Sequence, residues 1–203
     1  MRIVYQSLLI VFLSLFFVAS NYKSNISKRH HRVICYYNPN IALTGQPVEC
    51  SWDDDTGLIP TIEKIKRVTQ FNSKFLVGQT TQRIDNAYAT IYENQRTIIC
   101  DVDFLESLNE QVGTQWAAIS VVAHEIGHHY YGHIEKGSNP LPSELEADYF
   151  CGFALARLGA SKEAAIAAMD KGIGTEEDTP SHPNKYDRIK YIINGWEKGK
   201  SGR

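Results

Sequence analysis

The segment Trp116–His133 constrains this chain more than any other stretch of its sequence. It reads WAAISVVAHEIGHHYYGH, and its apolar residues recur at the spacing of a helix. His124 and His128 are four residues apart, so on a helix both side chains lie on one face and can converge on one ion. Glu125 is rotated by about 100° from His124, which excludes it as a ligand but lets it reach a water on the metal. The HExxH spacing therefore predicts two zinc ligands and a general base.

A second helical segment, which begins Ser143-Glu144-Leu145-Glu146-Ala147-Asp148, supplies carboxylates. A hydrolytic zinc site needs three protein ligands and an open fourth position, and Glu144 can be the third ligand. Glu144 and Asp148 share a helix face, whereas Glu146 points nearly the other way. Metal-bound histidines usually donate their second ring N–H to a carboxylate, so we expect Asp148 to accept such a bond. Ser143 and Glu146 fit a capping box, so we expect Glu146 to cap the helix.

The first residues of the chain predict export or a membrane anchor. Residues 3–19 are almost wholly apolar and follow a short basic head. The densest apolar run, residues 8–19, is closer to signal-peptide length than to the roughly 20 residues of a spanning helix, and Val18-Ala19-Ser20 offers small residues for cleavage. A cleaved signal peptide is thus favoured over an anchor. We expect an extracytoplasmic protein that is periplasmic, secreted or attached to the membrane through this segment. The basic residues that follow, Lys23, Lys28, Arg29 and Arg32, oppose the positive-inside rule and leave the orientation open.

Beyond the leader, about 180 residues remain, enough for one domain with a core. We divide the chain into a leader (1–20), an irregular, polar lead-in (21–57), a domain that carries the predicted zinc site (58–198) and a tail (199–203). The formal net charge of −2 gives no reason to expect a nucleic-acid partner. The four cysteines include no CxxC pair. They form either two disulfides, of which we favour Cys35 with Cys50 and Cys100 with Cys151, or, for Cys100 and Cys151, buried thiols.

The remaining pattern predicts an α+β fold. An amphipathic helix opens at Pro60 and Thr61, and a second runs from Phe104 to about Gln111. Between them, three β-branched and aromatic runs read as antiparallel neighbouring strands, namely residues 75–77, 87–92 and 97–100. An Ala-rich helix over residues 162–171 and a last helix that ends near Trp196 complete the domain.

The last helix is preceded by Ser181-His182-Pro183, and Arg188 follows shortly after. The order HEIGH, ELEAD and SHPNKYDR resembles the gluzincin peptidases of the CAAX prenyl protease and HtpX family, especially its small exported members. The resemblance covers roughly residues 86–188. It implies a zincin-like metallopeptidase domain with a small, mostly antiparallel sheet and a helical half that carries the active site. The chain lacks the additional membrane spans of the prenyl proteases, so a prenylated substrate is not expected.

The family's residues carry over to matching positions of this chain. The resemblance implies one zinc ion on His124, His128 and Glu144, with Glu125 as the base and Asp148 behind the ligands. It also implies that His182 and Arg188 lie near the oxyanion or support the site. The segment Asn86-Ala87-Tyr88-Ala89 resembles the family's edge strand, which pairs with extended substrate. His133 matches a frequent family histidine to which we assign no catalytic role.

The expected activity is hydrolysis of peptide bonds by a metal-activated water, with Glu125 as general base and a peptide or unfolded protein as substrate. Exported or envelope proteins are the expected targets. Two alternatives remain open. One is a non-catalytic, zinc-stabilised interaction domain, which turnover would exclude. The other is an aminopeptidase-like enzyme, which substrates with blocked N-termini would distinguish.

Overall fold

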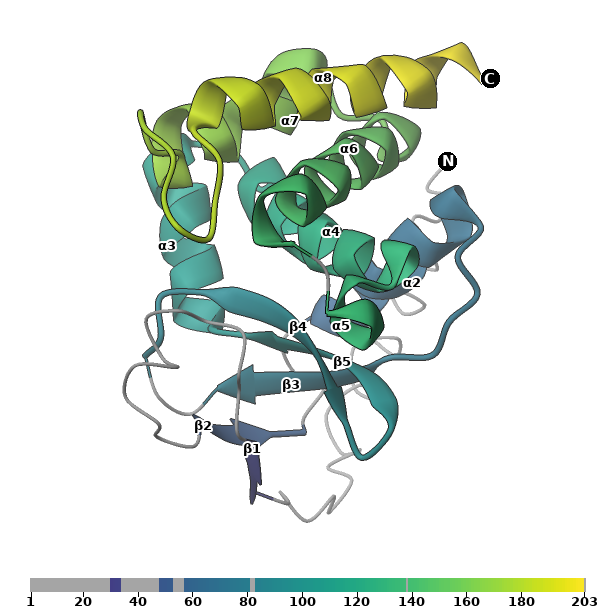
Figure 1. The fold of residues 1–203 in the computed structure, drawn as a ribbon, viewed down its shortest axis with the longest axis vertical. Coiled ribbons are helices and arrows are strands. Elements are labelled where there is room, and N and C mark those ends of the chain that lie inside the picture. The colour runs from purple at the N-terminus through teal and green to yellow at the C-terminus, as the bar shows by residue number, and fades with distance from the viewer. Residues whose placement is uncertain (1–29, 34–47, 53–56, 81–82, 138, 203) are drawn as a thin grey trace, which may run out of the picture.

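The computed structural model describes residues 30–33, 48–52, 57–80, 83–137 and 139–202. A small sheet lies at one end of the molecule, and helices stack above one face of it (Figure 1). The expectation of an α+β fold is therefore confirmed. The elements, in chain order, are β1 (His30–Val33), β2 (Val48–Ser51), α2 (Leu58–Thr69), β3 (Leu76–Thr80), β4 (Ala87–Tyr92), β5 (Gln95–Cys100), α3 (Val102–Val112), α4 (Trp116–Tyr131), α5 (His133–Lys136), α6 (Pro140–Leu158), α7 (Lys162–Ala168), the π-helical turn η1 (Met169–Ile173) and α8 (Lys185–Ser201).

The five strands are ordered β1-β2-β3-β5-β4, which leaves β4 at an edge of the sheet. β4 and β5 form an antiparallel hairpin through Glu93 and Asn94, both at positive φ as a tight primed turn requires. β3 pairs with β5 and not with β4. The two strands run parallel, with Leu76 opposite Thr97. The prediction of three antiparallel neighbours is thus wrong for β3. β1 and β2 also fall within the segment that we expected to be irregular.

Helix α4 lies in the middle of the core. It contacts β4 and β5 below and α6 above (Figure 1). Its residues 120–129 are all buried, which is typical of a helix surrounded by protein. Its neighbours in the core include Ile98 and Cys100 of β5 and Leu155 of α6. The polar residues of the HExxH motif are therefore surrounded by closely packed apolar side chains, which restrict their positions.

Helices α6 and α8 approach each other closely because glycine lies at their contact. A Cβ atom added to Gly152 would overlap the carbonyl group of Ile192, and one added to Gly195 would overlap that of Tyr149. α8 also continues to Ser201 instead of ending near Trp196, so the buried Gly199 belongs to the helix. The contacts at Gly152 and Gly195 set the distance between α8 and α6, and so the position of the first turn of α8 relative to α6.

The structure corrects one prediction about the cysteines. Cys100 and Cys151 are buried free thiols, so the pairing of these two residues is wrong and the alternative is confirmed. The Cys151 thiol donates to the carbonyl of Ser120, at 3.3 Å. Cys35 lies outside the described residues, so its predicted bond to Cys50 stays a prediction, as does the leader at residues 1–20. Among the described residues, no helix is both long and apolar enough to cross a membrane.

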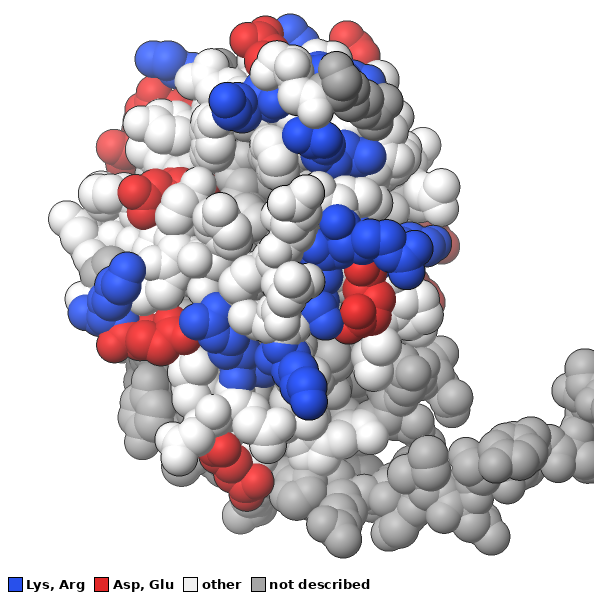
Figure 2. Space-filling view, turned by 90° about the vertical axis from the view of Figure 1, so that its right-hand side faces the viewer, with Lys and Arg blue, Asp and Glu red and all other residues white. Residues whose placement is uncertain are grey.

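The surface in Figure 2 carries basic and acidic side chains interspersed over a mostly uncharged face. This mixture is in keeping with the small formal net charge of −2.

Candidate metal centre

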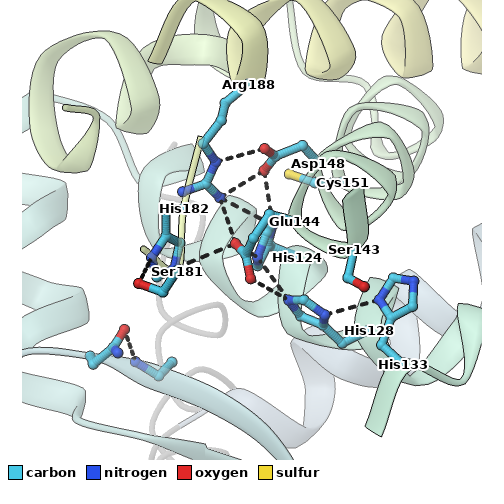
Figure 3. A network of polar contacts seen from close by, with 12 residues as sticks. His124, His128, His133, Ser143, Glu144, Asp148, Cys151, Ser181, His182 and Arg188 are labelled. Atoms are coloured by element: carbon cyan, nitrogen blue, oxygen red, sulfur yellow. Dashed lines mark hydrogen bonds and ion pairs between the residues drawn. The ribbon is translucent and has the colours of Figure 1, made fainter. Parts of the chain in front are cut away.

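His124, His128 and Glu144 bring three ligand atoms within 4.8 Å of one another, in a buried group that could bind a metal ion. The first two come from neighbouring turns of α4, and Glu144 comes from α6, which crosses above it (Figure 3). The two Nε2 atoms are 3.1 Å apart. Oxygens of Glu144 lie 3.2 Å from Nε2 of His124 and 3.3 Å from Nε2 of His128. Close contact between α4 and α6 is possible because Gly127 has no side chain. A Cβ atom added there would meet the backbone of Ala147.

The donor set fits a cation better than it fits internal hydrogen bonding. Oε2 of Glu144 is buried and has no hydrogen-bond partner among the described residues, although nitrogens of His124, His182 and Arg188 face it at 3.2 to 3.5 Å. An unsatisfied buried carboxylate oxygen is costly unless an ion completes its environment. Burial disfavours the charge of Glu144, but the positive charge of His124 outweighs burial and holds the pKa of Glu144 well below its ordinary value. Glu144 is therefore ionised, as a ligand must be.

Asp148 orients His124, as the four-residue spacing predicted. Its Oδ1 lies 2.9 Å from Nδ1 of His124, which directs Nε2 of that ring toward Glu144. Asp148 also accepts two hydrogen bonds from Arg188, one from Nε at 2.7 Å and one from Nη2 at 2.9 Å. Burial opposes protonation of His124, but the Asp148 and Glu144 carboxylates outweigh it and raise the pKa of His124 to about 10. Asp148 and Arg188 thus lie directly against the group that could bind a metal ion.

Glu125 lies beside the ligands on the side of the edge strand. Burial raises the pKa of its carboxyl group to about 7, while the charge of His124 and a hydrogen bond from the Ala89 backbone lower it. Ala89 belongs to β4, whose outer edge no other described strand covers. The edge strand that was predicted from Asn86 to Ala89 therefore borders the site and holds the candidate base.

His182 reaches the site from the loop before α8. Its Nδ1 lies 2.8 Å from Oγ of Ser181, and its Nε2 faces Oε2 of Glu144 at 3.5 Å (Figure 3). Burial lowers the pKa of His182, so the ring is neutral near pH 7. The backbone N–H of His182 also donates to the hydroxyl of Thr179, which fixes the loop. Some 42% of the His182 side chain is exposed, so the ring faces solvent on one side and Glu144 on the other.

Two cavities meet at His124, Glu125 and His182. One, of about 240 Å³, has an apolar wall that includes Val121, Met169 and Ile173. The other, of about 280 Å³, runs along Ala87–Ala89 and reaches Glu144 and Pro140. Both cavities therefore reach His124, and the second also reaches His128 and Glu144.

Glu146 does not cap helix α6, contrary to the prediction. α6 begins at Pro140 after Asn139, so Ser143 lies inside the helix and its hydroxyl donates to the carbonyl of Asn139 at 2.7 Å. The carboxylate of Glu146 lies 2.8 Å from Nε2 of His133 instead. Nδ1 of His133 is in turn 3.1 Å from Nδ1 of His128. The number of histidines near the motif was the one available signal of this chain of contacts.

Comparison with known proteins adds no assignment. No protein-family model, curated protein or solved structure matches this chain. The resemblance to the gluzincin family and the roles carried over with it therefore stay predictions.

Proposed function

We propose that this protein is a zinc-dependent endopeptidase of the gluzincin type, with a zincin-like domain. The observation that carries the proposal is that Glu125, with its pKa raised to about 7, lies beside the buried His124, His128 and Glu144 at the floor of an open cleft. Hydrolytic zinc sites have three protein ligands, an accessible coordination position and a general base beside it.

The spacing of the ligand atoms supports zinc in particular. With bonds of about 2.05 Å, a tetrahedral zinc ion separates its ligand atoms by about 3.3 Å. The two Nε2 atoms are 3.1 Å apart, which is close to this value, and Glu144 places Oε2 at 3.2 Å from Nε2 of His124 and Oε1 at 3.3 Å from Nε2 of His128. Two imidazoles and one carboxylate are also ligands that zinc accepts, whereas calcium and magnesium prefer sets of oxygen ligands. Metal analysis of the purified protein distinguishes zinc from other transition metals.

The chain's own residues provide the proton transfers and the charge stabilisation. When bound, the ion would polarise the scissile carbonyl and lower the pKa of a water from about 15.7 towards 7. Glu125 accepts a proton from the attacking water and delivers it to the amide nitrogen that leaves. His182 donates from Nε2 to the carbonyl oxygen as negative charge develops there. Ser181 supports this role by donating its hydroxyl to Nδ1, which keeps the single proton of the neutral ring on Nε2.

The edge strand supports an extended peptide as the substrate. None of the described strands pairs with the outer edge of β4, and Ala87–Ala89 line the cleft beside Glu125. An added strand can form backbone hydrogen bonds there whatever its side chains. Because cavities lie on both sides of Glu125, a chain can extend in both directions from the reacting bond, which favours an endopeptidase over an aminopeptidase. The apolar leader makes exported or envelope proteins the proposed targets.

The test is digestion of a reduced, alkylated protein by the metal-loaded chain, by the chain after chelation, and after one equivalent of zinc is restored. We expect internal fragments that disappear with chelation and return with zinc, and equal cleavage of a peptide whether or not its N-terminus is acetylated. Cleavage of free N-termini alone would favour the aminopeptidase. Stoichiometric zinc without any turnover would favour the non-catalytic interaction domain.

A further inference from the structure

The two candidate metal-ligating histidines are supported in different ways. Nδ1 of His124 meets the buried carboxylate of Asp148 directly. Nδ1 of His128 instead meets another imidazole, that of His133 (Figure 3). Nε2 of His133 lies 2.8 Å from the carboxylate of Glu146. His133 is only 4% exposed, whereas the side chain of Glu146 is 54% exposed. A row of three groups therefore connects the buried ligand to the surface.

A break in the helix brings His133 back to His128. In a continuous helix, a residue five positions further on is rotated by about 140° and points away. Here α4 ends at Gly132, which adopts a left-handed conformation with φ of 72°. That conformation favours glycine, because a side chain is strained there. The chain starts again as α5 at His133, and its ring contacts that of His128, with 5.2 Å between the ring centroids.

The protons of this row can be assigned by elimination. Nε2 of His128 faces the other ligand atoms, so it must be unprotonated to bind a cation, and its single proton lies on Nδ1. Nδ1 of His133 must then accept this N–H, which puts the proton of His133 on Nε2. Glu146 is the acceptor that faces this second N–H. Each contact in the row therefore favours the ligating form of His128.

We propose that His133 and Glu146 are positioning residues, which hold His128 in the tautomer and orientation that bind the metal. The inference rests on the proposed metal site and corrects the helix-capping role of Glu146. Outer hydrogen-bond partners of this kind typically contribute a factor of about 10 to 100 to metal affinity.

Packing is the competing explanation for His133, because its ring stacks on Tyr131 at 5.5 Å between centroids. Two substitutions separate the explanations. His133→Phe keeps a ring but removes both nitrogen atoms. His133→Asn loses the ring but places an amide oxygen near the position of Nδ1, where it can accept the N–H of His128.

The measurement is the zinc dissociation constant of the full chain, obtained by competition with a chromogenic chelator. For His133→Phe we expect zinc affinity to fall by about 10- to 100-fold, with most of the loss recovered in His133→Asn. The opposite order, tight binding with Phe and weak binding with Asn, would overturn the proposal in favour of packing. A wild-type chain that takes up no stoichiometric metal would contradict the metal site itself, and is thereby distinguished from failure of this inference alone.

Glu146 provides a second test that leaves the interior intact. Glu146→Ala should weaken zinc binding, because the N–H of His133 loses its acceptor. Glu197→Ala is a matched control, since Glu197 is also a helical carboxylate, has a side chain 58% exposed and pairs with Lys162 at 2.9 Å. Equal zinc dissociation constants for these two variants would exclude Glu146 from the row.

Discussion

Arg188 and Asp148 form a buried ion pair with two hydrogen bonds, beside the His124, His128 and Glu144 group that could bind a metal ion. Both hydrogen bonds are short, at 2.7 and 2.9 Å, and the two residues are forty positions apart in the chain. Arg188 stands in the first turn of α8, and the glycine contact between α6 and α8 sets its height above Asp148. The candidate ligand His124 is thus supported by a helix that contributes no candidate ligand.

Asp148→Asn tests this dependence. The variant removes the negative charge that His124 and Arg188 share, and leaves the buried guanidinium without its main counter-charge. We expect zinc affinity to fall by about 10- to 100-fold and the free energy of unfolding by about 3 to 5 kcal/mol. Chelator competition and urea unfolding measure the two effects. An unchanged zinc dissociation constant would mean that Asp148 serves stability alone.

Gly152→Ala tests the contact between the helices. At an ordinary interior helix position, replacing Gly by Ala stabilises a protein by about 0.5 to 1 kcal/mol. Here the new methyl group overlaps the carbonyl of Ile192, so we expect destabilisation by about 1 to 3 kcal/mol. Because α8 carries Arg188, zinc affinity should fall as well. Thermal unfolding that shifts upward would contradict the close approach of α6 and α8.

His182→Phe tests the proposed oxyanion donor. Loss of one such donor typically lowers kcat by about 10²- to 10³-fold. We expect this loss with KM and zinc content little changed, because His182 is not among the three ligands. Ser181→Ala, which removes the group facing Nδ1, should give a smaller decrease in kcat. A His182→Phe variant with wild-type kcat would remove His182 from the mechanism.

His129 should make stability depend on pH. It is fully buried, its Nε2 lies 2.9 Å from the carbonyl of Thr97, and burial lowers its pKa to about 4. The unfolded chain binds this proton at about pH 6.5, so stability is lost as the pH falls below that value, by about 3 kcal/mol at pH 4. His129→Gln keeps a donor toward Thr97 without this titration. The wild type should therefore lose more stability between pH 7 and 4 than the variant, and parallel curves would contradict the assignment.

Local spacing was enough to predict the elements that carry the metal group. His124, Glu125 and His128 are fixed relative to one another by one helix, and Asp148 lies one turn from Glu144 on another. Their prediction needed only the period of a helix.

The features that sequence reasoning did not predict depend on contacts between distant segments. The parallel pairing of β3 with β5 skips the intervening strand β4 and leaves no local pattern. The contact of Glu146 with His133 matters for the site only because the turn at Gly132 brings His133 next to His128. The glycines of α6 and α8 acquire a meaning only when the two helices are placed together.

The most direct test of the account is the ratio of turnover to bound zinc in Glu125→Gln. Glu125 is proposed as the base and not as a ligand, so the variant should bind one equivalent of zinc with wild-type affinity while hydrolysis falls by about 10²- to 10⁴-fold. Glu144→Ala, measured in parallel, should lose the zinc as well as the activity, because Glu144 is one of the three ligands. Wild-type turnover by zinc-loaded Glu125→Gln would contradict the proposed mechanism.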